Sequence, residues 1–201
     1  MSLLDKIHGQ HVFRRRVRVL SRMFAELLPA NASVLDVGCG EGSIDSLIMT
    51  LRPDISIRGT DRLVRSHTHI PVDLLDSNTL PYGDESIDVV LLVDVLHHSQ
   101  DPIGLLREVA RVARHKILLK DHICEGPWDH LVLKTMDWVG NARHGVPLLS
   151  NYWSRRQWEE AFTRLSLIPV QSREKLGLYP RPAGWIFDRS LHFLAEIEKR
   201  K

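Results

Sequence analysis

Short apolar runs alternate along this chain with longer stretches in which apolar residues recur every three or four positions. The short runs predict strands at 33–37, 55–61, 69–74, 87–93 and 117–119, and two late strands near 167–173 and 185–194. Helical spacing predicts helices at 42–51, 101–115 and 154–165. This alternation predicts an α/β fold: a doubly wound, Rossmann-like sheet of seven mostly parallel strands with helices on both faces.

Local signals set the ends of several elements. Pro71 weakens the third strand and places it near a sheet edge, whereas the run IDVVLLV is typical of a central strand buried on both faces. Asp101 and Pro102 predict a helix start, and we expect that helix to end at Arg114 and His115, whose charges would complement its negative end. The pattern S-x-x-Q predicts a capping box at the start of the last helix.

The first thirty residues, 1–30, form a predicted helical segment in which apolar residues recur at spacings of seven and four. Basic side chains cluster on this segment, and a solvated helix face is the plain interpretation of such a cluster. Attraction to a membrane surface or to an anionic substrate is the alternative. The cluster consists of Arg14, Arg15, Arg16, Arg18 and Arg22.

Composition suits one globular domain spanning 1–201, with 43% apolar and 26% charged residues. The net charge of +2 and the lack of an N-P-P-Y-type motif give no indication of nucleic-acid binding. No apolar run has the length of a membrane span, so we expect no stable membrane insertion. Cys39 and Cys124 form no disulfide framework and fit a reducing compartment. We therefore expect a soluble, cytoplasmic protein.

The segment VLDVGCGEG places three glycines in a turn between the first strand and the following helix, where the backbone can approach a ligand closely. A dinucleotide fingerprint would require glycine where Ser43 stands. Asp36 and Glu41 would also repel a pyrophosphate, which disfavours a nicotinamide-dependent oxidoreductase. A ligand with an ammonium group and no phosphate resolves the conflict, and S-adenosylmethionine is such a ligand.

A second acid follows at the end of the next strand. Asp61 lies 19 residues after Gly42, where a carboxylate can hold the hydroxyl groups of a ribose. A turn acid or a helix cap is the plain alternative for this residue. The two acids in this order strengthen the interpretation as a cofactor site.

With these motifs the chain resembles the class I S-adenosylmethionine-dependent methyltransferases between about residues 33 and 119. It is most similar to a small-molecule group whose pattern is an acid, then LPF, an SFDVV-type strand and LHH. Here these stretches are DSNTLPY, SIDVV and VLHH. One departure lies at 113–116, where ARHK replaces the proline-glycine-glycine turn that the family often shows.

The resemblance implies a division of the cofactor site among the motifs. Asp94, which follows the fourth strand, would shape the cofactor pocket. The methionine end would lie against Asp36, Gly38 and Gly40, with Cys39 in the same loop, the ribose against Asp61, and the adenosine against Arg62 and Asp76.

Four of the five tryptophans lie between residues 128 and 158, interleaved with polar side chains. The segment 123–153 follows the fifth strand, is not required by the fold and is predicted to be a substrate lid. Packing of the tryptophans onto the domain is the plain alternative, and Trp158 is expected in the core. The tryptophans are Trp128, Trp138, Trp153 and Trp158, and the polar residues are Asp129, His130, Asp137, Asn141, His144 and Tyr152.

Methyl transfer requires alignment and, for an oxygen or carbon nucleophile, removal of a proton. His97 and His98 follow the fourth strand, and Asp121 and His122 end the fifth, so all four reach one edge of the sheet. We expect His98 or His122 to act as the base and Asp121 to orient it, with a structural role as the alternative for each histidine.

Metal-ligating residue types are present without the tight spacings of a zinc site, so no metal is expected; they are Asp121, His122, Cys124, His130 and Asp137. Arginines that could recognise an acidic small molecule are Arg143, Arg155, Arg156, Arg173 and Arg181.

The sequence therefore predicts S-adenosylmethionine-dependent methyl transfer to a small-molecule acceptor, either a metabolite, a lipid intermediate or a natural product, at oxygen, carbon or nitrogen. The alternative is a catalytically silent cofactor-binding subunit or sensor. Both the acceptor and the oligomeric state stay open at this point.

Overall fold

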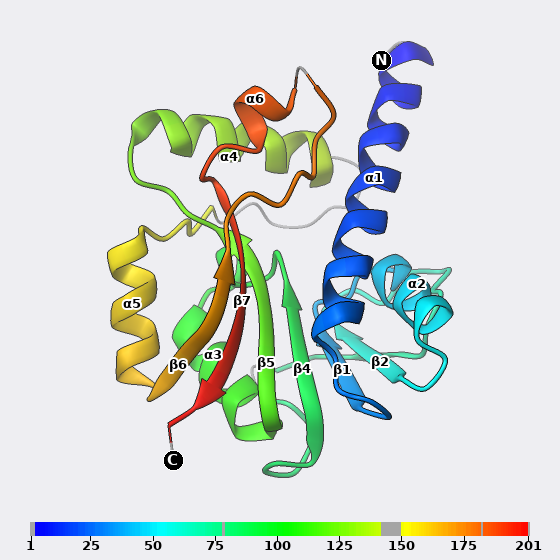
Figure 1. Ribbon diagram of the computed structural model, residues 1–201, viewed down its shortest axis with the longest axis vertical. Coiled ribbons are helices and arrows are strands. Elements are labelled where there is room, and N and C mark those ends of the chain that lie inside the picture. Colours follow the sequence, from blue (N-terminus) through cyan, green and yellow to red (C-terminus); the bar gives the residue numbers. More distant parts are fainter. Residues whose placement is uncertain (1–2, 78, 142–149, 182, 201) are drawn as a thin grey trace.

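The computed structural model of the chain describes residues 3–77, 79–141, 150–181 and 183–200 (Figure 1). The strands are β1 (Ser33–Val37), β2 (Ser56–Asp61), β3 (Val72–Leu74), β4 (Ile87–Val93), β5 (Ala113–His122), β6 (Leu167–Arg173) and β7 (His192–Lys199). The helices are α1 (Leu3–Leu27), α2 (Ser43–Leu51), the 3-10 helix η1 (Leu96–His98), α3 (Pro102–Val112), α4 (Pro127–Asn141), α5 (Arg155–Arg164) and α6 (Gly184–Phe187).

The described strands form one seven-stranded sheet in the order β3-β2-β1-β4-β5-β7-β6. Strands β1 to β5 run parallel to one another, and β7 runs antiparallel to both β5 and β6. The predicted fold class is thereby confirmed. The strand order reverses between β1 and β4, and in sheets of this kind ligands bind outside the carboxyl ends of the strands at such a reversal.

Helices cover both faces of the sheet because successive side chains of a strand point to opposite faces. Leu35 and Val37 of β1 belong to an apolar cluster that includes α3 and α5. Val34 belongs to a second cluster, which includes α1 and α2. Figure 1 shows α4 and α6 together beyond the carboxyl ends of β4 and β5, so these two helices cover the edge where the site is expected.

Several local signals have the predicted outcome. Strand β3 lies at an edge of the sheet, as expected from Pro71. The backbone N–H of Gly104 donates to the Asp101 side chain at 2.8 Å, which caps α3. Ser154 and Gln157 form the predicted capping box at the start of α5.

The expected helical role of Arg114 and His115 was wrong. Helix α3 ends at Val112, and both basic residues belong to β5. Nη1 of Arg114 donates to Oδ1 of Asp88 at 2.5 Å, and Nε2 of His115 lies 3.6 Å from the same oxygen. Both side chains therefore face a carboxylate of β4, and the strand begins where the family's turn would stand.

The second late strand was also placed wrongly. Residues 184–187 form the short helix α6, and β7 begins only at His192. Trp185 and Ile186 gave the segment an apolar, strand-like pattern, yet both side chains are exposed. Asp188 accepts from the backbone N–H groups of Leu178 and Tyr179, which holds this turn away from the sheet.

The predicted N-terminal helix is present and begins near the chain start, at Leu3. Of the segment predicted as a lid, 123–153, the structure describes 123–141 and 150–153; Arg143 and His144 lie outside the described residues. Within the described part of the chain, we find no helix with the length and apolar character needed to cross a bilayer.

Candidate active site

The glycine loop after β1 lies against the residues that follow β4. Gly38 has a φ of +79°, and a Cβ placed there would lie 2.5 Å from Cγ2 of Val95. Gly40 also has a positive φ, +63°. Position 38 therefore requires glycine both for its backbone conformation and because a side chain there would contact Val95 too closely. The loop and the start of the histidine segment therefore form one continuous surface.

Asp61 is attached to the same loop. Its Oδ2 accepts from the backbone N–H of Gly40 at 2.8 Å, and its Oδ1 accepts from the N–H of Leu63 at 2.9 Å. Arg62 and Asp76 lie farther out and are exposed. The resemblance implies Asp61, Arg62 and Asp76 for ribose and adenosine. These residues lie at or just after the carboxyl ends of β2 and β3, near the glycine loop.

Two buried carboxyl groups lie beneath the loop, Asp36 on β1 and Asp45 in the first turn of α2. Oδ1 of Asp36 and both side-chain oxygens of Asp45 have no hydrogen-bond partner among the described residues. Burial, together with the neighbouring Asp45 carboxyl, raises the pKa of Asp36, and burial raises the pKa of Asp45 to about 6. Such a pair favours a cationic group nearby, and the ammonium of S-adenosylmethionine fits this requirement.

Sequence reasoning identified Asp36 and missed Asp45. A carboxylate in the otherwise apolar helix face that includes Ile44 and Ile48 was the available signal. Cys39, between the glycines, is half-buried, and burial followed by the nearby Asp36 charge raises the pKa of its thiol. The thiol is therefore a packing group of the loop.

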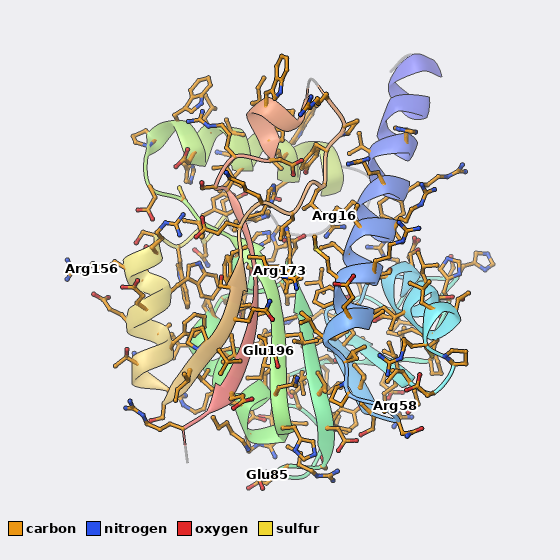
Figure 2. The ribbon with its side chains drawn as sticks, in the orientation of Figure 1. Arg16, Arg58, Glu85, Arg156, Arg173 and Glu196 are labelled. Carbon is orange, nitrogen blue, oxygen red and sulfur yellow. The ribbon has the colours of Figure 1, made fainter. Side chains whose placement is uncertain are left out.

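Asp94 lies at the centre of an ion network at the end of β4. Its carboxylate accepts hydrogen bonds from Arg16 of α1 and from the fully buried Lys120 of β5. Figure 2 shows Arg16 pointing from α1 toward the sheet. Although burial opposes ionisation, Lys120 and Arg16 hold the pKa of Asp94 well below its usual range. Asp94 also has a φ of +58°, a strained conformation of the kind found at functional sites.

The prediction that Arg16 belongs to a solvated face was wrong, because its guanidinium pairs with Asp94. The other members of the basic cluster do face solvent: Arg14, Arg15, Arg18 and Arg22 are exposed.

His97 lies between two carboxylates. Its Nδ1 is 2.6 Å from Oδ1 of Asp121, and its Nε2 is 3.4 Å from Oδ2 of Asp137, which comes from α4. Burial lowers the pKa of His97, but Asp121 and Asp137 outweigh burial and raise it to about 10. Asp121 therefore orients His97, and it accepts a hydrogen bond from the backbone N–H of His122 at 2.8 Å.

His122 belongs to a second buried contact. Its Nδ1 lies 3.0 Å from Nδ1 of His192 on β7, which in turn lies 3.2 Å from Nζ of Lys120. Burial and the Lys120 charge lower the pKa of both histidines well below the usual value. Nε2 of His122 faces Asp94 at 3.5 Å and Asp137 at 3.9 Å. His122 is thus a neutral imidazole that faces two carboxylates.

His98 is only half-buried and stacks against His97, with ring centroids 4.0 Å apart. Burial and the charge of His97 lower its pKa. The fold therefore brings together all four predicted catalytic residues, His97, His98, Asp121 and His122. The fold also adds Lys120 and His192 to this cluster, and neither was predicted. For Lys120 a signal was available, because it directly precedes Asp121 in a predominantly apolar strand.

Part of the predicted lid contacts this network. Tyr152 donates its phenolic hydrogen to Asp137, and its ring stacks on His97 at a centroid distance of 5.4 Å. Trp128 and Trp138 are exposed, so they do not line the buried network. Trp158 lies in the core as predicted.

This chain is similar to known methyltransferases in both sequence and fold. Residues 8–171 match the family model described as a methyltransferase domain. The chain is 31% identical over 139 residues to 27-O-demethylrifamycin SV methyltransferase of Amycolatopsis mediterranei, covering 56% of this chain and 51% of that protein. It is 33% identical over 110 residues to phthiotriol/phenolphthiotriol dimycocerosates methyltransferase 1 of Mycobacterium ulcerans, covering 50% and 41% respectively.

A solved structure of a SAM-dependent methyltransferase from Aquifex aeolicus superposes with a TM-score of 0.57 at 16% identity, covering 89% of this chain and 88% of that one. This likeness shows a shared fold. The chain spans about half or less of the length of these two curated relatives. Because the family match covers most of the chain, this protein belongs to the methyltransferase domain family, and it has the class I fold of S-adenosylmethionine-dependent methyltransferases.

Proposed function

We propose that this chain transfers the methyl group of S-adenosylmethionine to a hydroxyl oxygen of a small, largely apolar acceptor. The observation that carries the proposal is the buried acid–histidine network at the carboxyl ends of β4 and β5, beside the glycine loop. Proton removal is needed for an oxygen nucleophile and not for an amine that is already neutral. The relative from Amycolatopsis mediterranei, named for 27-O-demethylrifamycin SV, supports an oxygen acceptor on a small molecule.

On this proposal the bound cofactor supplies an electrophilic methyl group on a sulfonium. The glycine loop would hold its methionine end, with Asp36 and Asp45 as the acids nearest to the ammonium. Asp61 would hold the ribose, and Arg62 and Asp76 would flank the adenosine; Asp94, with Cys39 in the loop opposite, would complete the wall of the pocket.

His122 is the base that the contacts favour. Its imidazole is neutral, and a proton taken up at Nε2 would lie near the carboxylates of Asp94 and Asp137. His98, whose pKa is also lowered, is the second candidate for the base and would contact the acceptor from the half-buried side of the cluster. Asp121 would act as a positioning residue, since it fixes the ring of His97.

The acceptor would reach the network from beneath α4, which belongs to the predicted lid. Exposed apolar side chains on α4 and α6 give this end of the molecule an apolar outer surface: Trp128, Leu131, Trp138, Trp185 and Ile186. These side chains lie outside the buried network, so an acceptor with a large apolar portion would contact them while its hydroxyl group reaches the network. Arg155 already pairs with Glu174, and Arg156 with Glu160.

Calorimetric titration with S-adenosylmethionine and S-adenosylhomocysteine, with NADH as control, tests the cofactor. Transfer of a labelled methyl group to a panel of matched alcohols, amines and acidic substrates tests the acceptor. We expect binding of the first two ligands alone and transfer to alcohols, with at least a hundredfold loss in His122→Gln. Tight cofactor binding without transfer to any acceptor would favour the silent-subunit alternative.

A further inference from the structure

His97, His98 and Asp137 converge on one point although they come from different parts of the sequence. His97 and His98 lie on η1, and Asp137 reaches them from α4. Each offers one ligand-type atom, and these three atoms lie within 4.8 Å of one another. His98 and Asp137 are 39 positions apart in the sequence, which is one reason why the sequence showed no zinc-type spacing.

The hydrogen bond of His97 fixes which nitrogen faces the cluster. Nδ1 contacts the Asp121 carboxylate at 2.6 Å, so Nε2 is the nitrogen directed toward Asp137. Within the described part of the chain, Nε2 makes no hydrogen bond and has only the Asp137 carboxylate facing it at 3.4 Å, and the side chain of His97 is only 2% exposed. Metal-ligating histidines adopt a similar arrangement: one ring nitrogen is hydrogen-bonded to a carboxylate, and the other is directed toward the metal.

Distance and charge agree with this arrangement. Nε2 of His97 and Oδ2 of Asp137 are 3.4 Å apart, and ligands about 2.1 Å from a tetrahedral metal ion are separated by about 3.4 Å. Two carboxylates, Asp121 and Asp137, flank the imidazole and favour positive charge at Nε2. A divalent cation there would take the place of the proton that they otherwise stabilise. Tyr152 donates to Asp137 and would fix that ligand in turn.

A second group of ligand-type side chains, Asp94, His97, Asp121 and His122, overlaps this one. It is less suitable because Asp94 already binds two cations, Arg16 and Lys120. Asp121 in turn accepts from Leu96, His97 and His122. The geometry points to a binding site for a divalent transition-metal ion, zinc or one of similar preference, formed by His97, His98 and Asp137, with Asp121 as the carboxylate behind His97. Two imidazoles select such ions over magnesium or calcium.

This inference rests on the proposed function only for its chemical role. An acceptor hydroxyl bound to the metal would lose its proton more readily, and His122 would take that proton. The oxygen–methyl bond would then form as the carbon–sulfur bond breaks, leaving neutral S-adenosylhomocysteine. Three protein ligands leave positions for the acceptor, as in catalytic rather than structural sites.

The test uses the full chain after treatment with a chelator. Titration with Co²⁺, followed by visible absorption, and calorimetry with Zn²⁺ should give one saturable site, and Mg²⁺ should give none. His97→Gln, His98→Gln and Asp137→Asn should each weaken the affinity at least a hundredfold. Asp121→Asn should weaken it ten- to a hundredfold, and the exposed His67→Gln should leave it unchanged.

Cofactor titration of the same samples separates this inference from the proposed function and reports whether each variant is folded. A folded chain that binds S-adenosylmethionine but shows no saturable Co²⁺ or Zn²⁺ binding would overturn the metal site and leave the methyltransferase intact. Binding that persists in His97→Gln and His98→Gln would overturn it as well. Loss of metal affinity in those variants, with cofactor affinity retained, would support it.

Discussion

Nδ1 of His97 and Oδ1 of Asp121 lie 2.6 Å apart, with both side chains buried where the segment after β4 meets the end of β5. The same carboxylate accepts from the backbone N–H groups of Leu96 at 3.1 Å and His122 at 2.8 Å. Asp121 therefore joins the start of η1 to the end of β5 and also fixes one ring. Its importance follows from these three contacts together.

Asp121→Asn should destabilise the protein and reduce methyl transfer. An amide keeps the size of the side chain but leaves the buried His97 without its charged partner, at a cost of about 3 kcal/mol. Urea unfolding should show this loss, and methyl transfer should fall at least tenfold. Affinity for S-adenosylmethionine should change less than threefold, because Asp121 does not contact the glycine loop.

The matched control is Asp84→Asn, in which an exposed carboxylate loses its pairing with Arg111. Exposed ion pairs contribute about 1 kcal/mol or less. Equal destabilisation by the two variants would contradict the role given to Asp121.

Gly38→Ala should weaken cofactor binding through a steric effect. The new methyl group would lie 2.5 Å from Cγ2 of Val95, at a φ of +79°. Calorimetry should show at least a tenfold loss of affinity for S-adenosylhomocysteine. Gly177→Ala is the control, because Gly177 has a similar φ, +66°, with no atom within 4 Å of an added Cβ. That variant should cost only about 1 kcal/mol of stability and leave cofactor affinity intact; a similar loss of affinity there would argue against the contact with Val95.

The sheet and the glycine loop could be predicted because their signals are local. The run IDVVLLV is apolar apart from Asp88, and the glycine turn is followed directly by a segment with helical spacing. The strand predicted at Trp185 and Ile186 was wrong for the same reason, because a local apolar pair indicates a buried strand. Tertiary contacts of Asp188 hold this segment at the surface instead, and the sequence does not show those contacts.

Polar pairing in the site was less predictable because it depends on tertiary geometry. His97, Asp121 and Asp137 are far apart in the chain, and nothing in their spacing shows that Asp121 contacts His97 rather than the ring of His122. Arg16 looked like its exposed neighbours on α1 because a single position on a helix separates solvent from the sheet. Residue types therefore indicated the chemistry, and the fold determined the partners.

Arg16→Met should weaken the attachment of α1 to the site. The variant keeps most of the apolar side-chain length but removes one of the two cations bound to Asp94, so Lys120 is left as the remaining one. We expect a lower thermal unfolding midpoint, by several degrees, and at least a tenfold loss of methyl transfer. Arg14→Met, at an exposed position of the same helix, should change neither. An unchanged midpoint and rate in Arg16→Met would show that the ion pair contributes nothing measurable.

The carboxyl pair beneath the glycine loop should make stability depend on pH. Asp45 has a folded-state pKa of about 6, against an ordinary value of 3.8, because burial favours its protonated form. A raised pKa means that the folded protein holds this proton more tightly than the unfolded chain does. The contribution is therefore fully present below about pH 4, falls as the pH rises through 6, and amounts to about 3 kcal/mol.

Other groups act in the opposite direction, since Arg16 and Lys120 lower the pKa of Asp94 and Arg52 lowers that of Asp54. The comparison of wild type with Asp45→Asn removes these shared contributions. Urea unfolding between pH 4 and pH 7 should show the variant gaining stability relative to wild type as the pH rises. Saturating S-adenosylmethionine should reduce the difference, because its ammonium would compensate the ionised pair of Asp36 and Asp45. A difference that does not vary with pH would mean that Asp45 ionises normally, and the cation preference inferred for the loop would then lose its support.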